Sequence, residues 1–332
     1  MARLSLGLLL IATISAVLLW SDLDRRNSAP VKADRVWNLR FVQMTNVADV
    51  EESEAGIRDS LKESGLREGM NYSIHVANAQ GDMATLPSLI DSANTAGADI
   101  IVTFSTPTLQ AAIQRAGKTP VVFNYVASPF AAGAGKTNSD HHPNVTGVYL
   151  AVPYDKTIAM IRRIFPKVAT IGTLYVPGES NSVAMERKLN EAAQAAGLRL
   201  ESVGANTSVE VNDAAMALCS RNIDAIVQVP GNLTAVAFSG IARAARQHKM
   251  PVFCFQTNQV REGALAALAS DYHGQGMLAG RTIARIIRGE GSTRDPFLPY
   301  QDTRLLLNLK TARESSWSIP RDLILQASEV IR

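Results

Sequence analysis

The sequence is short of cysteine and of net charge. It contains only two cysteines, Cys219 and Cys254, in 332 residues, and its formal net charge is +3 with 19% charged residues. A charge this small, without a basic stripe, lacks the electrostatic footprint of a nucleic-acid-binding protein, so we expect no nucleic-acid partner. Cys254 lies in an apolar run, where a buried free thiol is more usual than a disulfide, although an oxidising compartment would permit a bridge.

Motifs that carry catalysis or cofactors are also missing. There is no Gly-x-Ser-x-Gly motif, and Gly133-Ala-Gly-Lys-Thr137 lacks the first glycine of a phosphate-binding loop because Phe130 stands there. The adjacent pair His141 and His142 has no cysteine or carboxylate cluster to complete a metal site. We therefore expect no cofactor, no metal and no enzymatic activity.

One long apolar run stands at the start of the chain. Arg3 precedes an uncharged stretch from Leu4 to Trp20, and polar residues follow from Ser21. This is the pattern of a secretory signal, with Val31-Lys-Ala33 as a distant cleavage site. The run is at the short limit for a membrane span, and an uncleaved anchor is the alternative. We expect residues 1–33 to be an export segment and the folded part to lie in the periplasm.

The main positive feature of the sequence is an internal repeat of strands and helices. In each half, short apolar runs alternate with helical runs that end at a glycine such as Gly65 or Gly197. The predicted strands of the first half are Leu39–Met44, Tyr72–Ala77, Asp99–Phe104 and Thr119–Phe123, and those of the second half are Ala169–Val176, Leu198–Gly204, Asp224–Val229 and Met250–Phe255. Strands that are apolar throughout and separated by helices are typical of parallel sheets covered on both faces.

This repeat predicts an α/β fold with two similar doubly wound parallel-sheet lobes, a hinge and a central cleft. A chain of 332 residues is also too long for one comfortable core. We expect the first lobe to comprise residues 34–154 plus 270–298, and the second to comprise residues 155–269 plus 299–332. Ligands of open α/β sheets bind beyond the carboxyl ends of the strands, so the cleft is the expected binding site. Short hinges favour a monomer.

Four strand-to-helix turns carry small hydroxyl or amide side chains and point to a polar pocket. Helix N-termini offer unpaired N–H groups and partial positive charge, which suit a carboxylate. Each turn taken alone is equally typical of an ordinary helix cap. The candidates in these turns are Thr45, Asn46, Ser105, Thr106, Thr108, Asn181, Ser182 and Asn232, and Ser128, Thr257 and Asn258 add further polar groups.

Two acids and two tyrosines complete the set of candidate site residues. Glu179 or Asp271 is the predicted partner of a ligand ammonium group, because a buried charge requires a counter-charge. Tyr125 and Tyr175 follow strands of opposite lobes and are predicted to form apolar walls. Packing of these tyrosines on neighbouring loops is the alternative.

Several segments in this order resemble the substrate-binding proteins of ABC transporters of the tryptophan/tyrosine type. The resemblance runs from about residue 36 to the end of the chain. It rests on Asn78–Ala84, Ser105–Thr108, Pro120–Phe123, Asn144–Val148, Ile171–Ser182, Gly263–Ala266, Asp271-Tyr272 and Ile319-Pro320. It implies a type I periplasmic-binding fold, no catalysis, and delivery of a small-molecule ligand to the permease subunits in the membrane.

The chain departs from the family at three positions near the cleft. Family members often have acids where this chain has Ser128, Gly231 to Leu233, and Gln256 to Asn258. The resemblance therefore predicts an exported solute-binding protein for an amino acid or related small molecule, with the exact ligand open. A periplasmic sensor module that signals to a membrane partner is the alternative, and an enzyme on the same fold is a second rival.

Overall fold

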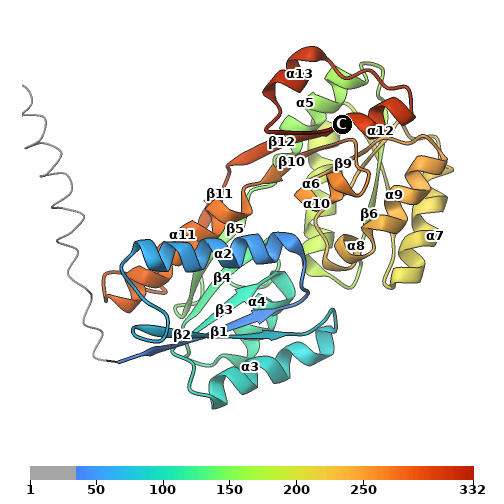
Figure 1. The fold of residues 1–332 in the computed structure, drawn as a ribbon. Helices are drawn as coiled ribbons and strands as arrows, with labels where there is room; N and C mark the ends of the chain where they lie inside the picture. The colour runs from blue at the N-terminus through green and yellow to red at the C-terminus, as the bar shows by residue number, and fades with distance from the viewer. Residues whose placement is uncertain (1–34) are drawn as a thin grey trace, which may run out of the picture.

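The computed structural model describes residues 35–332, and these residues form two α/β lobes joined side by side (Figure 1). The predicted export segment lies outside the described residues. Within residues 35–332, no helix has both the length and the apolar character needed to cross a membrane.

The first lobe is built on a six-stranded sheet in which every pair of neighbours is parallel. Its strand order is β11-β5-β4-β3-β1-β2. The strands are β1 (Trp37–Gln43), β2 (Tyr72–Asn78), β3 (Ile100–Phe104), β4 (Val121–Val126), β5 (Val145–Leu150) and β11 (Leu298–Tyr300). The helices that cover it are α2 (Ala48–Glu63), the short η1 (Met83–Thr85), α3 (Leu86–Thr95), α4 (Thr106–Arg115) and α11 (Tyr272–Ile287).

The second lobe is built on a seven-stranded sheet with the order β13-β12-β10-β9-β8-β6-β7. Only the β10–β12 pair is antiparallel among its described pairings. The strands are β6 (Thr170–Tyr175), β7 (Arg199–Gly204), β8 (Ala225–Val227), β9 (Val252–Cys254), β10 (Ala266–Ser270), β12 (Thr303–Asn308) and β13 (Glu329–Ile331). Its helices are α5 (Tyr154–Ile164), α6 (Ser180–Ala195), α7 (Ser208–Cys219), α8 (Asn232–Val236), α9 (Phe238–Gln247), α10 (Thr257–Arg261), α12 (Leu309–Glu314) and α13 (Arg321–Gln326).

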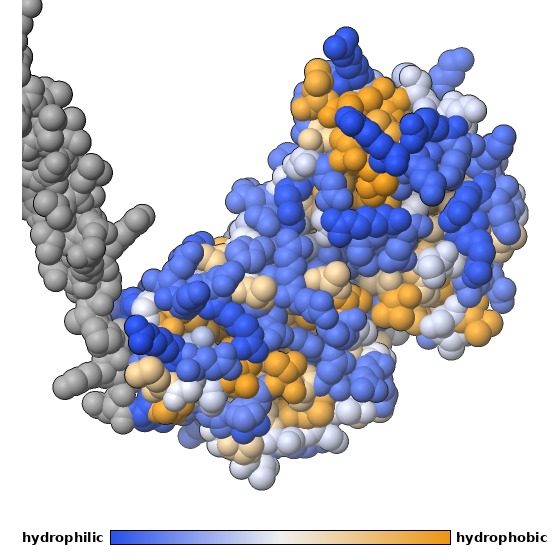
Figure 2. Space-filling model, in the orientation of Figure 1, coloured by the Kyte–Doolittle hydropathy of each residue, from blue (hydrophilic) through white to orange (hydrophobic). Residues whose placement is uncertain are grey.

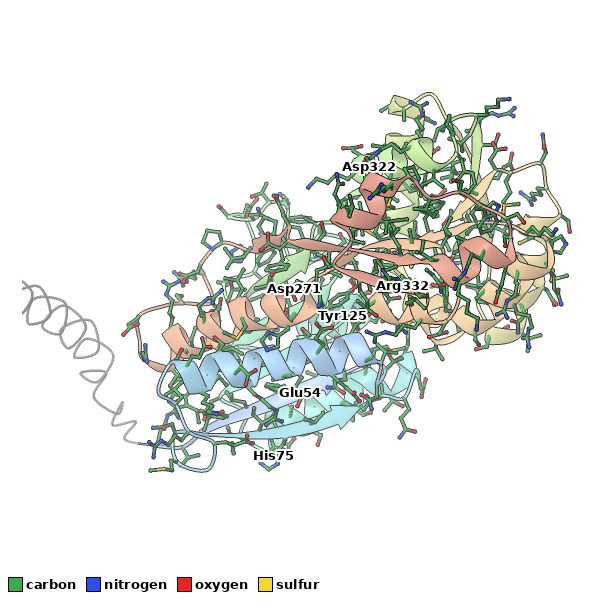
Figure 3. The ribbon with its side chains drawn as sticks, turned by 45° about the horizontal axis from the view of Figure 1, so that its top comes forward. Glu54, His75, Tyr125, Asp271, Asp322 and Arg332 are labelled. Atoms are coloured by element: carbon green, nitrogen blue, oxygen red, sulfur yellow. The ribbon has the colours of Figure 1, made fainter. Side chains whose placement is uncertain are left out.

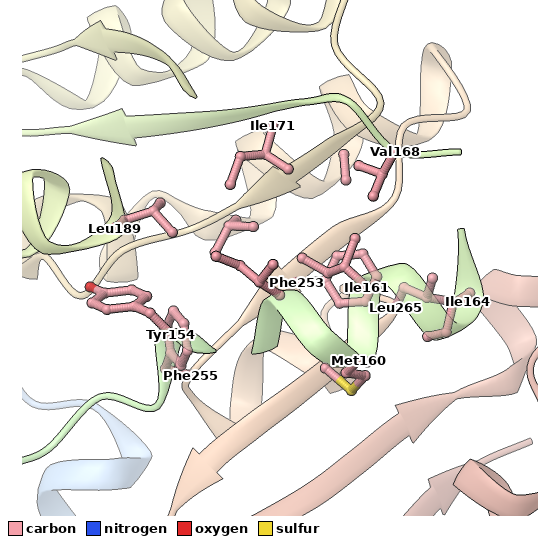
Figure 4. Close-up of a cluster of buried hydrophobic side chains, with 14 of the residues drawn as sticks. Tyr154, Met160, Ile161, Ile164, Val168, Ile171, Leu189, Phe253, Phe255 and Leu265 are labelled. Atoms are coloured by element: carbon pink, nitrogen blue, oxygen red, sulfur yellow. The ribbon is translucent and has the colours of Figure 1, made fainter. Parts of the chain in front are cut away.

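The cores explain why apolar runs form the central strands. All five residues of β3 are buried, as expected for a parallel strand covered by helices on both faces. In the second lobe, Tyr154 and Phe255 pack edge to face with ring centroids 5.2 Å apart, beside Phe253 and Leu265 (Figure 4).

Cys219 and Cys254 are both buried and free. The visible outer face is mostly hydrophilic, and an orange area lies where α13 carries the exposed Leu325 (Figure 2).

Helices α2 and α11 pack unusually closely because glycines lie between them. A β-carbon built on Gly276 would lie 2.0 Å from the carbonyl oxygen of Ser53, and one on Gly56 would lie 2.1 Å from that of His273. Distances this short do not occur between real β-carbons and backbone atoms, so only glycine fits at these two positions. The contact fixes the N-termini of both helices beside the junction of the lobes.

The chain passes between the sheets three times, after β5, after β10 and after β11. Backbone hydrogen bonds join these crossings, from Ala151 to Tyr300 at 3.0 Å and from Asp271 to Asp302 at 3.1 Å. Three neighbouring connections joined by hydrogen bonds form the structural basis of a hinge.

Several element boundaries differ from the sequence prediction. Strand β8 spans Ala225–Val227 rather than Asp224–Val229, and β9 spans Val252–Cys254 rather than Met250–Phe255. Helix α6 begins at Ser180, so Asn181 and Ser182 lie in its first turn instead of capping it.

Candidate ligand-binding site

A small cavity lies between the two lobes, where the carboxyl ends of their strands face each other. Its volume is about 30 Å³, far below the roughly 300–1,000 Å³ that is typical of ligand pockets. It is lined by Thr45, Val47, Ser105, Thr106, Tyr125, Ala127, Leu150, Asn181, Pro230, Gly231, Asn232, Ala235, Gln256 and Tyr272. These residues come from both lobes, and Figure 3 shows Tyr125 at the junction between them. The lobes are therefore nearly closed on each other.

The N-termini of α4 and α6 reach this cavity from opposite lobes. Thr106 is the first residue of α4, and Asn181 is the second residue of α6. The two helices contact each other, and the Ser180 hydroxyl donates to Oε1 of Gln110 at 3.4 Å. First-turn N–H groups lack intrahelical acceptors, and each helix end carries partial positive charge. Two such ends at one cavity favour an anionic ligand group.

Two tyrosines and a glutamine form the wall on the hinge side. The rings of Tyr125 and Tyr272 are tilted, with centroids 5.3 Å apart. The Gln256 side chain donates from Nε2 to the Tyr125 hydroxyl at 2.7 Å across the lobes, and the Tyr272 hydroxyl donates to the carbonyl of Phe255 at 2.9 Å. Burial raises the pKa of both phenols well above its usual value, so both stay protonated and uncharged.

Backbone strain is concentrated at two residues of the cavity wall. Ser105 has φ 99° and ψ 158°, and Tyr125 has φ 54° at a bulge in β4. Non-glycine residues in these regions cost about 1–3 kcal/mol each, and such strain is typical of functional sites. The strain at Ser105 places its side chain at the start of α4, where its hydroxyl lies 3.2 Å from that of Thr108.

Replacing Ser105 with glycine tests this strain. Glycine adopts φ 99° without a steric penalty, so S105G is expected to stabilise the ligand-free protein by about 1 kcal/mol. The same change removes a hydroxyl from the cavity and is expected to weaken ligand binding. Thermal unfolding of the variant checks the first effect, and a lower melting temperature than that of the wild type would contradict it.

A buried acid that the sequence pattern did not single out lies beside this wall. Asp49, in the first turn of α2, is 1% exposed, and its Oδ1 accepts a hydrogen bond from Thr257 of the other lobe at 2.8 Å. Its second oxygen, Oδ2, is buried and has no partner. Burial raises the pKa of Asp49 to about 6, opposed by the hydrogen bond from Thr257 and reinforced by the nearby charge of Glu52.

The two predicted acids do not line the cavity. Glu179 is buried, and its oxygens accept hydrogen bonds from Asn232, Leu233 and Asn181. Asp271 lies at the hinge, with Oδ1 3.6 Å from the guanidinium of Arg304, and Figure 3 shows it near the junction of the lobes. Neither residue is among those that line the cavity.

The remaining predicted residues divide between the cavity, a second groove and structural roles. Thr45, Ser105, Thr106, Tyr125, Asn181 and Asn232 line the cavity. Thr45 also lines a second groove of about 740 Å³, and Asn46 lies in the wall of that groove. The hydroxyls of Thr108, Ser128, Ser182 and Thr257 bond to other parts of the protein, Asn258 pairs with Glu262, and Tyr175 packs on the second core.

Several lining residues carry no recognisable signal in the sequence. Val47, Leu150, Ala235 and Tyr272 look like ordinary core or helix residues, and Gln256 stands out only as a departure from an acid. Tyr272 directly follows Asp271 at a lobe crossing, which is the one feature that could have marked it. Among residues 35–332, no group of histidine, cysteine and acidic side chains is placed to hold a metal ion.

Comparison with known proteins decides the family. Residues 42–331 match the family model described as ABC transporter substrate binding protein. The chain belongs to this family. Its tryptophan/tyrosine-type resemblance is confirmed by a curated relative named tyrosine-binding protein from Clostridioides difficile, which is 27% identical over 276 residues, covering 83% of this chain and 80% of the relative.

Solved structures of substrate-binding proteins confirm the predicted two-lobed type I periplasmic-binding fold. A conserved domain protein from Vibrio cholerae superposes with a TM-score of 0.85 at 29% identity, covering 89% of this chain and 100% of that one. An ABC domain from Streptococcus pneumoniae in complex with L-Trp gives a TM-score of 0.84 at 26% identity, covering 90% and 100%.

A third relative distinguishes the open and closed arrangements of the lobes. It is a substrate binding protein with adhesive properties from Clostridium difficile in its ligand-free, open form, with a TM-score of 0.70 at 29% identity, covering 89% of this chain and 99% of that one. Identity and coverage are similar to those of the L-Trp complex, yet the superposition is poorer. The lobes of this substrate-binding protein are therefore arranged more as in the L-Trp complex than as in the ligand-free, open structure.

Proposed function

We propose that this protein is the exported solute-binding component of an ABC importer and binds an amino acid, with aromatic amino acids as the first candidates. The lobes close on the ligand, and the closed form is presented to the permease subunits outside the cytoplasm. The protein acts as a monomer and catalyses no reaction.

The observation that carries this proposal is the meeting of the N-termini of α4 and α6 at one interlobe cavity with a tyrosine wall. The helix ends suit a carboxylate, and Tyr125 and Tyr272 offer faces for an apolar or aromatic side chain. The names of two relatives, one tyrosine-binding and one solved with L-Trp, support the same class of ligand. Opening of the lobes is required for entry because the cavity of about 30 Å³ is far smaller than a typical ligand pocket of roughly 300–1,000 Å³.

A thermal-shift screen of the purified protein against amino acids, their decarboxylated amines, organic acids and sugars tests this function. A ligand at one hundred times its dissociation constant adds about 2.7 kcal/mol of stability, which corresponds to a rise of several degrees in melting temperature. We expect L-Trp, L-Tyr or L-Phe to raise the melting temperature and the corresponding amines to fail. A response only to sugars, or to no compound with a carboxylate, would refute the proposal.

A further inference from the structure

Glu179 is the most fully bonded carboxylate in the described part of the molecule. Its Oε2 accepts hydrogen bonds from the backbone N–H of Asn232 at 2.7 Å, from Nδ2 of Asn232 at 2.9 Å and from Nδ2 of Asn181 at 3.3 Å. Its Oε1 accepts from the backbone N–H of Leu233 at 2.9 Å. The side chain is buried at the start of α8. Glu179 is therefore occupied by protein donors and is not itself available to a ligand.

This arrangement fixes the orientation of the Asn181 side chain. An ionised carboxylate only accepts hydrogen bonds, so the side of the Asn181 amide that faces Glu179 must be the NH₂ group. The amide oxygen, Oδ1, consequently points away from Glu179. Asn181 is 4% exposed and lines the cavity, and its Oδ1 is buried without a hydrogen-bond partner. A buried amide oxygen without a donor is costly and rare in native proteins.

We propose that Oδ1 of Asn181 accepts a hydrogen bond from the ammonium group of the ligand, and that Glu179 acts as the positioning residue that holds this oxygen toward the cavity. The inference rests on the proposed function, and it assigns the recognised group to the wall of the second lobe. No acidic side chain is among the residues that line the described cavity, so we assign the ammonium group to a neutral acceptor. The buried Asp49 beside the wall is the alternative that the test below distinguishes.

The negative charge of Glu179 makes a neutral amide suitable for this task. The hydrogen bond from Nδ2 to the carboxylate polarises the amide and increases the negative partial charge on Oδ1, because hydrogen bonds in series strengthen one another in a low-dielectric interior. The first-turn N–H groups of α6 and α4 lie at the same cavity and bind the carboxylate. An α-amino acid places its two charged groups one carbon apart, which matches an acceptor and donors that belong to the same helix turn.

The test compares each amino acid with its desamino analogue. Calorimetric titrations of the full chain use L-Phe with 3-phenylpropionate and L-Trp with 3-(indol-3-yl)propionate, so that only the ammonium group differs within a pair. We expect N181L to weaken binding of the amino acid roughly ten- to hundredfold and to change binding of the desamino acid less than about threefold. Q228M is the matched control, because Oε1 of Gln228 is also buried and unpaired but lies outside the cavity lining.

Glu179 is tested through selectivity rather than through affinity alone. In E179Q the new amide can donate to Asn181, which releases Oδ1 from its enforced direction. We expect the ratio of dissociation constants within each pair to approach one, whereas a general loss of stability would weaken both members equally.

Unchanged ratios in N181L and E179Q would overturn this inference but leave the proposed function intact. Loss of the selectivity in D49N alone would also overturn it, since the ammonium group would then bind Asp49. A wild-type protein that binds no amino acid would overturn both the inference and the proposed function.

Discussion

Replacing Gly276 with alanine is expected to destabilise the protein by about 2 kcal/mol, and replacing it with valine is expected to prevent folding. The new β-carbon would lie 2.0 Å from the carbonyl oxygen of Ser53, which is a backbone atom in the middle of α2 and cannot rotate away. The helices must therefore separate. Overpacking of a close contact of this kind outweighs the gain of about 1 kcal/mol that alanine normally brings to a helix.

The separation also affects the site, because α2 and α11 begin beside the cavity. Val47 precedes α2, and Tyr272 is the first residue of α11. We therefore expect G276A to weaken ligand binding in addition to lowering the melting temperature. Thermal unfolding and titration of the same preparation measure both effects.

Gly178 provides the matched control for this substitution. A β-carbon built there would lie 3.5 Å from its nearest neighbour, Oδ1 of Asn206, which is ordinary van der Waals contact. G178A is expected to leave the melting temperature within about 1 °C of the wild type. A G276A variant that melts at a higher temperature than the wild type would mean that helix propensity dominates and that α2 and α11 are not closely packed.

Replacing Asp49 with asparagine is expected to stabilise the closed, ligand-free protein above pH 6 by up to about 3 kcal/mol. Burial raises the pKa of Asp49 from 3.8 to about 6, so the folded protein holds this proton more tightly than the unfolded chain. The contribution of Asp49 to the free energy of unfolding of the wild type is fully present below pH 4 and is lost as the pH rises through 6. Asparagine keeps an oxygen that can accept from Thr257 but carries no charge at any pH.

The charged groups around Asp49 agree with an upward shift of its pKa. Glu52 on the same helix adds a repulsive charge, whereas Arg304 from the second lobe lies 2.6 Å from Glu52 and offsets part of it. Melting temperatures of D49N and wild type at pH 4.0 and 7.5 measure the effect, with an expected advantage for D49N of roughly 5 °C at pH 7.5 only. D91N, at an acid that is about half exposed, is the control. An equal difference at both pH values would contradict the assignment of a raised pKa.

The sequence predicted the fold because the alternation of apolar strands with helical runs is repeated in both halves of the chain. Apolar runs such as Ile100 to Val102 and Ala225 to Val227 form central parallel strands, as their composition and spacing indicate. The positions of the binding turns followed from the same rule, since the carboxyl ends of parallel strands meet at one edge. Thr106 and Asn181 line the cavity for this reason.

The sequence could not predict contacts between distant segments. Asp49 and Thr257 are 208 residues apart and meet only because the lobes close, so neither has a local signature. Glu179 was expected to face the ligand, but its carboxylate accepts hydrogen bonds at the start of α8, from Asn232, which is 53 residues further along the chain. These hydrogen bonds depend on how two loops pack. Asp271 similarly lies near Arg304 of β12. Helix ends can be located from local patterns, whereas the partner of a buried charge depends on tertiary packing.

A structure of the protein crystallised with the amino acid that binds it most tightly tests the proposed binding mode most directly. We expect one ligand molecule between the two sheets, with its carboxylate at the N-termini of α4 and α6, its ammonium group at Oδ1 of Asn181 and its side chain against Tyr125 and Tyr272. A ligand bound in the second groove beside Asn46, or on the surface of one lobe alone, would contradict this binding mode.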